Sequence, residues 1–148
     1  MNKPHKAGVA AAGFIFNDEG KVLMQQRTGS NGADTWCPPG GKLDFGEHPV
    51  EAFMREVKEE TDVEITDVKH IGFSNDVFED DGLHFVTIWF VAKLKSGTPK
   101  IMEPHKCLNL VWCDLDDMPK KLFQPTNFTL NDADMSRKIR AYREGITK

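Results

Sequence analysis

The chain has 148 residues, of which 39% are hydrophobic and 28% charged, and its net charge is −4. These values are typical of one globular domain and exclude an intrinsically disordered chain. The acidic balance excludes a global positive field that would attract nucleic acid or anionic membranes, although it leaves room for a local basic pocket.

The N-terminus and the cysteines bear on cellular location. Residues 1–6 are polar and contain no apolar signal-peptide core. No apolar run in the chain approaches the roughly 18 residues that span a bilayer. Cys37, Cys107 and Cys113 are odd in number and lack CxxC spacing, which argues against a disulfide framework and against structural zinc. We therefore expect a cytoplasmic protein with no membrane partner.

The chain is predicted to begin with a β-hairpin. Residues 8–16 are an apolar run, residues 18–20 form a turn, and residues 21–27 give a second strand. Residues 28–34 are rich in Gly, Ser and Asn and are predicted to form a loop. Residues 36–41 combine prolines with glycines, so we expect no regular structure there.

A helix is predicted over residues 49–61. Proline suits the first turn of a helix, and Pro49 stands there. Apolar residues then recur at helical spacing, which defines a face that can pack on a sheet. These residues are Val50, Phe53, Met54 and Val57.

The rest of the chain is predicted to form strands followed by a second helix. Strands are expected within residues 63–73, over 84–93 and over 108–114, with a hairpin turn at residues 80–82. The second helix is expected over residues 130–143. Strands mixed with two helices indicate an α+β or α/β/α layered arrangement.

Three acidic side chains lie close together in the predicted first helix. Glu56, Glu59 and Glu60 are spaced three and four residues apart, so they share one helix face. Carboxylates concentrated above an apolar face suit Mg²⁺, a hard cation that takes oxygen ligands. The alternative is a solvated acidic stripe, but it leaves unexplained the Pro-Gly-Gly turn at residues 39–41, whose exposed backbone groups would come near the helix.

The segment from residue 41 to residue 63 resembles the Nudix box, G-x5-E-x7-R-E-U-x-E-E-x-G-U, where U is apolar. One position departs, because Asp62 stands where the box has glycine. A helix often ends in left-handed geometry at such a position, and we expect Asp62 to adopt it at some strain. The matching residues are Gly41, Glu47, Arg55, Glu56, Val57, Glu59, Glu60 and Val63.

The resemblance extends beyond the box and is greatest to MutT-related nucleoside-triphosphate diphosphatases. It implies an α+β protein with the Nudix fold, an α/β/α sandwich with a mixed sheet, in a single domain over residues 1–148. Relatives are often dimers, which implies a homodimer. The similar segments are the first strand, residues 36–41, the strand ending at Lys93, residues 103–112 and residues 122–125.

The resemblance also implies roles within the box. It places Mg²⁺, with Mn²⁺ as a substitute, on Glu56, Glu59, Glu60 and the carbonyl of Gly41. Glu56 is a further candidate for orienting the attacking water. Arg55 is counted with these carboxylates as catalytic, and a salt bridge from Arg55 to Glu47 would hold the preceding loop on the helix.

Candidates for binding substrate are Gly40, Gly41, Lys42, Arg27 and Phe123. Lys42 and Arg27 suit substrate phosphates and suit equally well a solvated surface. Phe123 is a candidate for stacking on a base, as are Trp112 and Phe14, although isolated aromatic residues more often lie in a core. Cys37 is expected to be a buried small hydrophobe, and His48 to open the helix.

An additional acid outside the box is common in the family, and Glu103 is the nearest candidate. In relatives an acid commonly follows the cysteine, but Leu108 follows Cys107 here. Asp76 and residues 79–81 are further acidic candidates and are expected to lie in a loop, where a solvated acidic turn is the favoured interpretation.

The function implied by the resemblance is Mg²⁺-dependent hydrolysis of a nucleoside diphosphate-linked small molecule. A (deoxy)nucleoside triphosphate, such as the oxidised purine 8-oxo-dGTP, would give a monophosphate and pyrophosphate. The alternatives are hydrolysis of ADP-ribose or another nucleoside diphosphate-X, and a non-catalytic nucleotide-sensing module. No nucleic-acid substrate is expected, because the chain is acidic and has no basic extension.

Overall fold

The computed structural model describes residues 6–148, so the N-terminal sequence interpretation lies almost wholly outside the described residues. The helices are α1 (Pro49–Thr61), α2 (Gln124–Asn131) and α3 (Ala133–Thr147), with a 3₁₀ turn, η1 (Glu79–Asp81). None of the helices in residues 6–148 is long and apolar enough to cross a membrane. The strands are β1 (Gly8–Phe16), β2 (Val22–Arg27), β3 (Trp36–Cys37), β4 (Gly40–Lys42), β5 (Glu64–Phe78), β6 (Leu83–Ser96) and β7 (Cys107–Cys113).

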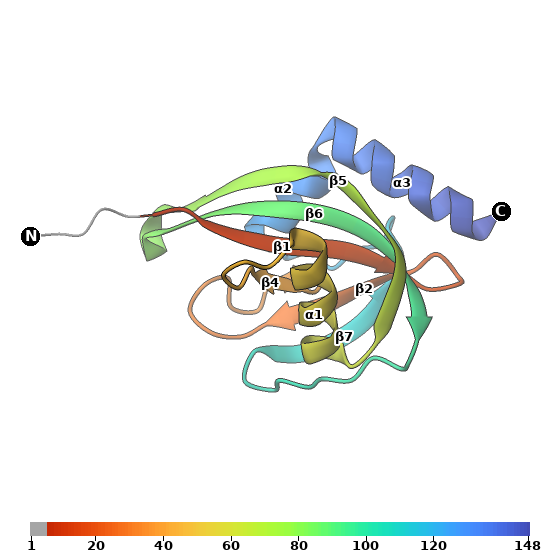
Figure 1. Cartoon of the computed structure of the whole chain (residues 1–148), viewed down its shortest axis with the longest axis horizontal. Coiled ribbons are helices and arrows are strands. Elements are labelled where there is room, and N and C mark those ends of the chain that lie inside the picture. The colour runs from red at the N-terminus through yellow and green to blue at the C-terminus, as the bar shows by residue number, and fades with distance from the viewer. Residues whose placement is uncertain (1–5) are drawn as a thin grey trace, which may run out of the picture.

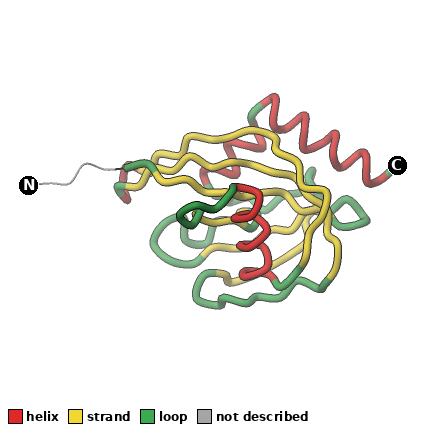
Figure 2. The backbone as a smooth tube through the Cα atoms, in the orientation of Figure 1, coloured by secondary structure: helices red, strands yellow, loops and turns green. Residues whose placement is uncertain are grey.

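The strands form one mixed sheet in the order β3-β2-β1-β6-β5, with β4 paired to β1 and β7 paired to β2. The central pair, β1 and β6, runs parallel, whereas the other pairs are antiparallel. In Figure 1, α1 lies in front of this sheet and α2 lies behind it. Figure 2 shows the loop that joins β2 to β3 at the left of the view and the long connection from β6 to β7 along its lower edge.

The central strands bury side chains on both faces, which explains why their sequences are almost continuously apolar. On one face, Phe53 of α1 stacks on Phe90 of β6 with ring centroids 5.4 Å apart. On the other face, Met135 and Ile139 of α3 pack in a cluster with Phe14 of β1. Helices therefore cover both faces, and the expected α/β/α sandwich with a mixed sheet is confirmed.

The prediction that residues 36–41 have no regular structure is wrong. Trp36 and Cys37 pair with β2, and Gly40 to Lys42 pair with β1. Pro38 and Pro39 interrupt the ladder between the two short strands. Trp36 and Cys37 pair before this break, and residues 40–42 pair after it. These tertiary pairings override the local propensity.

The helix predicted over residues 130–143 corresponds to α3, and α2, directly before it, was not predicted. Asp132 ends α2 and caps α3, since its carboxylate accepts a hydrogen bond from the backbone N–H of Met135 at 3.0 Å. Helix α2 contains Pro125 and mostly polar residues, so its sequence lacks the apolar periodicity from which a helix is predicted. Met54 also departs from prediction: it is 42% exposed, and Ala52 takes its place on the buried face of α1.

Helix α1 begins and ends with local signals in its own sequence. His48 caps the N-terminus, with Nδ1 accepting from the N–H of Val50 at 3.1 Å, and Pro49 occupies the first turn. Asp62 ends the helix with φ 59° and ψ 30°, the left-handed geometry predicted for it. Its side chain forms ion pairs with Lys58 at 3.2 Å and Lys100 at 3.7 Å.

We expect Asp62→Gly to raise the free energy of unfolding by about 0.5–1 kcal/mol, because glycine adopts left-handed geometry without a Cβ penalty. The ion pairs to Lys58 and Lys100 are solvent-exposed and offset only part of this gain. Denaturant melts at low and high salt check the effect. Asp62→Asn is the control, because it removes the charge and keeps the Cβ. If the glycine variant is no more stable than the unmodified protein at high salt, Asp62 is not strained in its left-handed geometry.

Candidate active site

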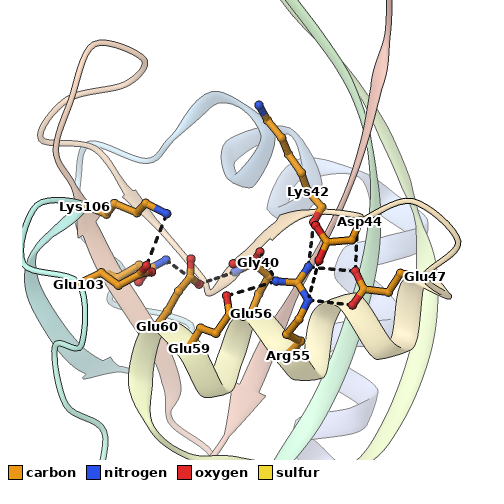
Figure 3. Close-up of polar contacts among 11 residues, drawn as sticks. Gly40, Lys42, Asp44, Glu47, Arg55, Glu56, Glu59, Glu60, Glu103 and Lys106 are labelled. Atoms are coloured by element: carbon orange, nitrogen blue, oxygen red, sulfur yellow. Dashed lines mark hydrogen bonds and ion pairs between the residues drawn. The ribbon is translucent and has the colours of Figure 1, made fainter.

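The loop before α1 is fixed to the helix by Arg55 (Figure 3). Its Nε and Nη2 donate to the two carboxylate oxygens of Glu47 at 2.8 and 2.9 Å, so the expected salt bridge is present. This hydrogen bonding lowers the pKa of Glu47 to about 2. Nη2 also donates to the carbonyl of Lys42 at 3.1 Å, which ties strand β4 to the same guanidinium.

The same guanidinium holds two of the three helix carboxylates. Nη1 of Arg55 lies 2.9 Å from Glu56 Oε1 and 3.2 Å from Glu59 Oε2. The side chain of Glu56 is 15% exposed, whereas that of Glu59 is 51% exposed. Glu56 is therefore directed into the protein and Glu59 lies at the rim.

Glu60 is the buried member of the group. Its Oε1 accepts from the backbone N–H of Gly40 at 3.0 Å and from the side-chain amide of Gln25 at 3.4 Å. Burial raises the pKa of Glu60 to about 8, and the negative charges of Glu56 and Glu103 add to the effect. A carboxylate in this setting gains strongly from a nearby cation.

Gly41 lets the backbone of β4 approach Glu56 closely. A Cβ at position 41 would lie 2.4 Å from Cδ of Glu56. Buried carboxylates beside an open backbone segment form an oxygen-rich donor set that fits a hard divalent cation. Across residues 6–148 no three acidic, histidine or cysteine side chains are gathered around one point; Glu56 and Glu59 are instead ion-paired with Arg55.

A cavity of about 530 Å³ opens beside these carboxylates. All five predicted substrate-binding residues line it, as do Glu56 and Glu60, but its lining does not include Glu59. Arg27 lies over the ring of Phe123, with Cζ 3.8 Å from the ring centroid. The Lys42 side chain points away from the carboxylates (Figure 3), toward the ring of Phe85.

Glu103 reaches the same cavity from the loop between β6 and β7. Lys106 pairs with it at 3.5 Å, and the backbone N–H of Thr28 donates to the Lys106 carbonyl at 3.1 Å. This contact joins the two long loops and brings the acid near Glu60. Lys106 and Gln25 were not predicted as site residues; the polar end of the second strand was the only sequence signal for Gln25.

The other aromatic and acidic candidates lie elsewhere. Phe14 is fully buried in the core behind the sheet, and Trp112 packs against the core beneath α1. Cys37 is buried, as expected, and burial raises the pKa of its thiol to about 11. The expectation that Asp76 lies in a loop is wrong: it lies in β5 and is 2% exposed. Glu79, Asp80 and Asp81 form η1 and are exposed.

The fold, with a carboxylate-bearing helix beside a glycine-rich strand, suits a hydrolase that acts on phosphate anhydrides with a divalent cation. The NUDIX domain model matches residues 6–138. The chain therefore belongs to the Nudix hydrolase family, enzymes that act on nucleoside diphosphate-linked substrates and generally use a divalent metal.

Individual relatives are named for several different activities. An 8-oxo-dGTP diphosphatase of Escherichia coli K12 is 32% identical over 74% of this chain and 85% of its own length. An ADP-ribose pyrophosphatase of Methanocaldococcus jannaschii is also 32% identical, over 78% of this chain and 66% of its own length. A MutT NUDIX hydrolase structure from Burkholderia pseudomallei superposes with a TM-score of 0.81 and 29% identity, covering 86% of this chain and 98% of that one.

Proposed function

We propose that this protein hydrolyses a (deoxy)nucleoside triphosphate to the monophosphate and pyrophosphate, with Mg²⁺ as cofactor. The observation that carries the proposal is a single cavity whose lining combines two kinds of side chain. Glu56, Glu60 and Glu103 are carboxylates that suit a metal-bridged diphosphate. The lining also contains aromatic and small side chains, including Trp89, Ala10 and Ala12, which suit a planar base. An oxidised purine nucleotide such as 8-oxo-dGTP is a candidate substrate.

Each residue around the carboxylates has a proposed task. Glu56, Glu59, Glu60 and the Gly41 carbonyl would hold Mg²⁺ or Mn²⁺, which when bound neutralises phosphate oxygens and lowers the pKa of water. Arg55 positions Glu56 and Glu59 through its ion pairs.

Hydrolysis itself needs a water and a proton acceptor. The oxygen of water attacks one phosphorus, the bond from that phosphorus to the bridging oxygen breaks, and the proton of the water passes to a carboxylate. Glu56 and Glu103 are the proposed acceptors, because both line the cavity beside the buried Glu60.

A nucleotide panel with Mg²⁺ tests this proposal. We expect pyrophosphate release from at least one (deoxy)nucleoside triphosphate with a higher kcat/KM than cleavage of ADP-ribose. The M. jannaschii relative makes ADP-ribose the relevant competitor. If ADP-ribose has the higher kcat/KM, a nucleoside diphosphate-X hydrolase replaces the proposal. Nucleotide binding without any turnover would instead support a non-catalytic sensing module.

Two further predictions from the sequence accompany this proposal. We propose a cytoplasmic location and a homodimeric state, both of which rest on the sequence alone. Sedimentation of the purified protein tests the second.

A further inference from the structure

Behind one wall of the cavity lies a chain of hydrogen bonds that the proposed hydrolysis does not use. Nε1 of Trp89 donates to Oγ of Ser74 at 2.8 Å, and Ser74 Oγ donates to Oδ2 of Asp76 at 3.1 Å. Oγ1 of Thr87 donates to the same oxygen at 2.6 Å. Ser74 and Asp76 are 1% and 2% exposed, so the network is sealed from bulk solvent.

The direction of these hydrogen bonds determines whether Thr87 presents a donor or an acceptor to the cavity. Oδ2 of Asp76 accepts both hydroxyl hydrogens. Burial raises the pKa of Asp76, but Oδ2 remains an acceptor even when Oδ1 carries a proton. Thr87 lines the cavity, and its hydrogen points to Asp76. Its oxygen therefore offers lone pairs to a ligand.

A second hydroxyl among the lining residues of the cavity has no partner within residues 6–148. Thr126 of α2 is fully buried, and no donor or acceptor in residues 6–148 pairs with its Oγ1. Thr126 lines the same cavity as Thr87. By contrast, Thr129 on the same helix donates to the carbonyl of Pro125 at 2.8 Å. Buried polar atoms almost always have partners, so the unpaired Thr126 hydroxyl is a candidate contact for a polar ligand group.

The sheet leaves room for a flat ring between these groups. Ala10 and Ala12 of β1 lie directly opposite Thr87 and Trp89 of β6 in the parallel ladder. Both alanines line the cavity. Because the two facing positions carry only methyl groups, they take up little of the space beside the Thr87 hydroxyl.

We propose that Thr87 and Thr126 form the base-recognition end of the cavity and select bases that carry an exocyclic amino group. Asp76 is a positioning residue, because it holds Thr87 as a hydrogen-bond acceptor. An amino N–H meets the lone pairs of Thr87 favourably, whereas a carbonyl oxygen in the same place is repelled by them. This inference rests on the proposed function only in that the ligand is a nucleotide.

Binding of nucleoside monophosphates tests the selection without requiring turnover. Titration calorimetry with the pairs AMP/IMP, GMP/IMP and CMP/UMP compares each amino base with a partner that lacks the amino group. We expect the amino form to bind at least about tenfold tighter in the pair that binds best, because a site built for a donor rejects an analogue without it. The corresponding triphosphates should show the preference in KM rather than in kcat.

Variants assign the preference to individual groups. Thr87→Val keeps the shape of the side chain and should bring the ratio within about twofold of one, whereas Thr87→Ser should keep most of the preference. Asp76→Asn should lower the ratio several-fold with little change in kcat. Thr126→Val should weaken monophosphate binding without lowering the Tm, because it deletes an unpaired buried hydroxyl. Thr129→Val is the matched control and should leave the ratio unchanged.

The outcomes separate this inference from the proposed hydrolysis. Equal affinities within all three pairs, or no measurable binding of any monophosphate, overturn the inference. Triphosphate turnover with equal affinities would overturn it while leaving the proposed function intact. A clear amino preference without turnover would support the inference and overturn the proposed function. An unchanged ratio in Thr87→Val would show that another group reads the base.

Discussion

Glu60→Gln is expected to lower kcat/KM by more than about 10²-fold while the protein remains folded, which is the scale of losing one preorganised charge. Glu60 is buried against the backbone of Gly40, with Glu56 and Glu103 as charged neighbours. Glutamine has nearly the same shape and keeps the oxygen that accepts from Gly40, but it lacks the charge that attracts a divalent cation. Glu59→Gln should show a loss of similar size.

Thermal melts distinguish loss of metal binding from loss of fold. In EDTA, Glu60→Gln should melt at or above the temperature of the unmodified protein, since it replaces a buried carboxyl whose ionisation is disfavoured by burial with a neutral amide. Added Mg²⁺ should raise the Tm of the unmodified protein and leave that of the variant unchanged. Glu144→Gln, an exposed change on α3, is the control. Near-normal turnover of Glu60→Gln at saturating Mg²⁺ would remove Glu60 from the metal site.

Gly41→Ala is expected to lower kcat/KM by up to about 10²-fold with little change in stability. The new Cβ would lie 2.4 Å from Cδ and 2.6 Å from Oε2 of Glu56, at the flexible end of that side chain. The carboxylate can move away at small energetic cost, so the fold survives. It then leaves the position from which it would serve the metal and the attacking water.

Two other glycines provide matched comparisons for Gly41→Ala. Gly145→Ala on α3 meets nothing within 4 Å and should leave activity unchanged. Gly40→Ala would place a Cβ 2.4 Å from the backbone carbonyl oxygen of Ala11, which cannot move freely, so it should lower the Tm substantially. Full activity of Gly41→Ala would show that close approach to Glu56 has no functional role.

Local sequence was sufficient to define α1 and the motif that it carries. The proline in the first turn and the apolar spacing act within a few residues, so they predicted the helix bounds correctly, and the structure adds a His48 cap at the same end. The left-handed geometry of Asp62 followed for the same reason. Resemblance to the Nudix box then gave the family, because its spacing depends on one loop and one helix.

The tertiary structure alone decided which distant residues meet. Strands β3 and β4 exist because β2 and β1 pair with them, a contact that no local pattern reveals. The burial of Glu60 depends on Gly40 and Gln25, which lie 20 and 35 residues away in sequence.

Asp76 shows the same limit most clearly. Acidic residues follow it at positions 79–81 and suggest a solvated turn, yet β5 extends through Asp76 and pairs it with β6. Alternation along a strand tells which residues share a face, but strand register decides which of them touch. Register and the docking of α2 thus placed Thr87 and Thr126 in the cavity lining, with Asp76 hydrogen-bonded to Thr87 behind it, since those contacts form only when separate segments pack together.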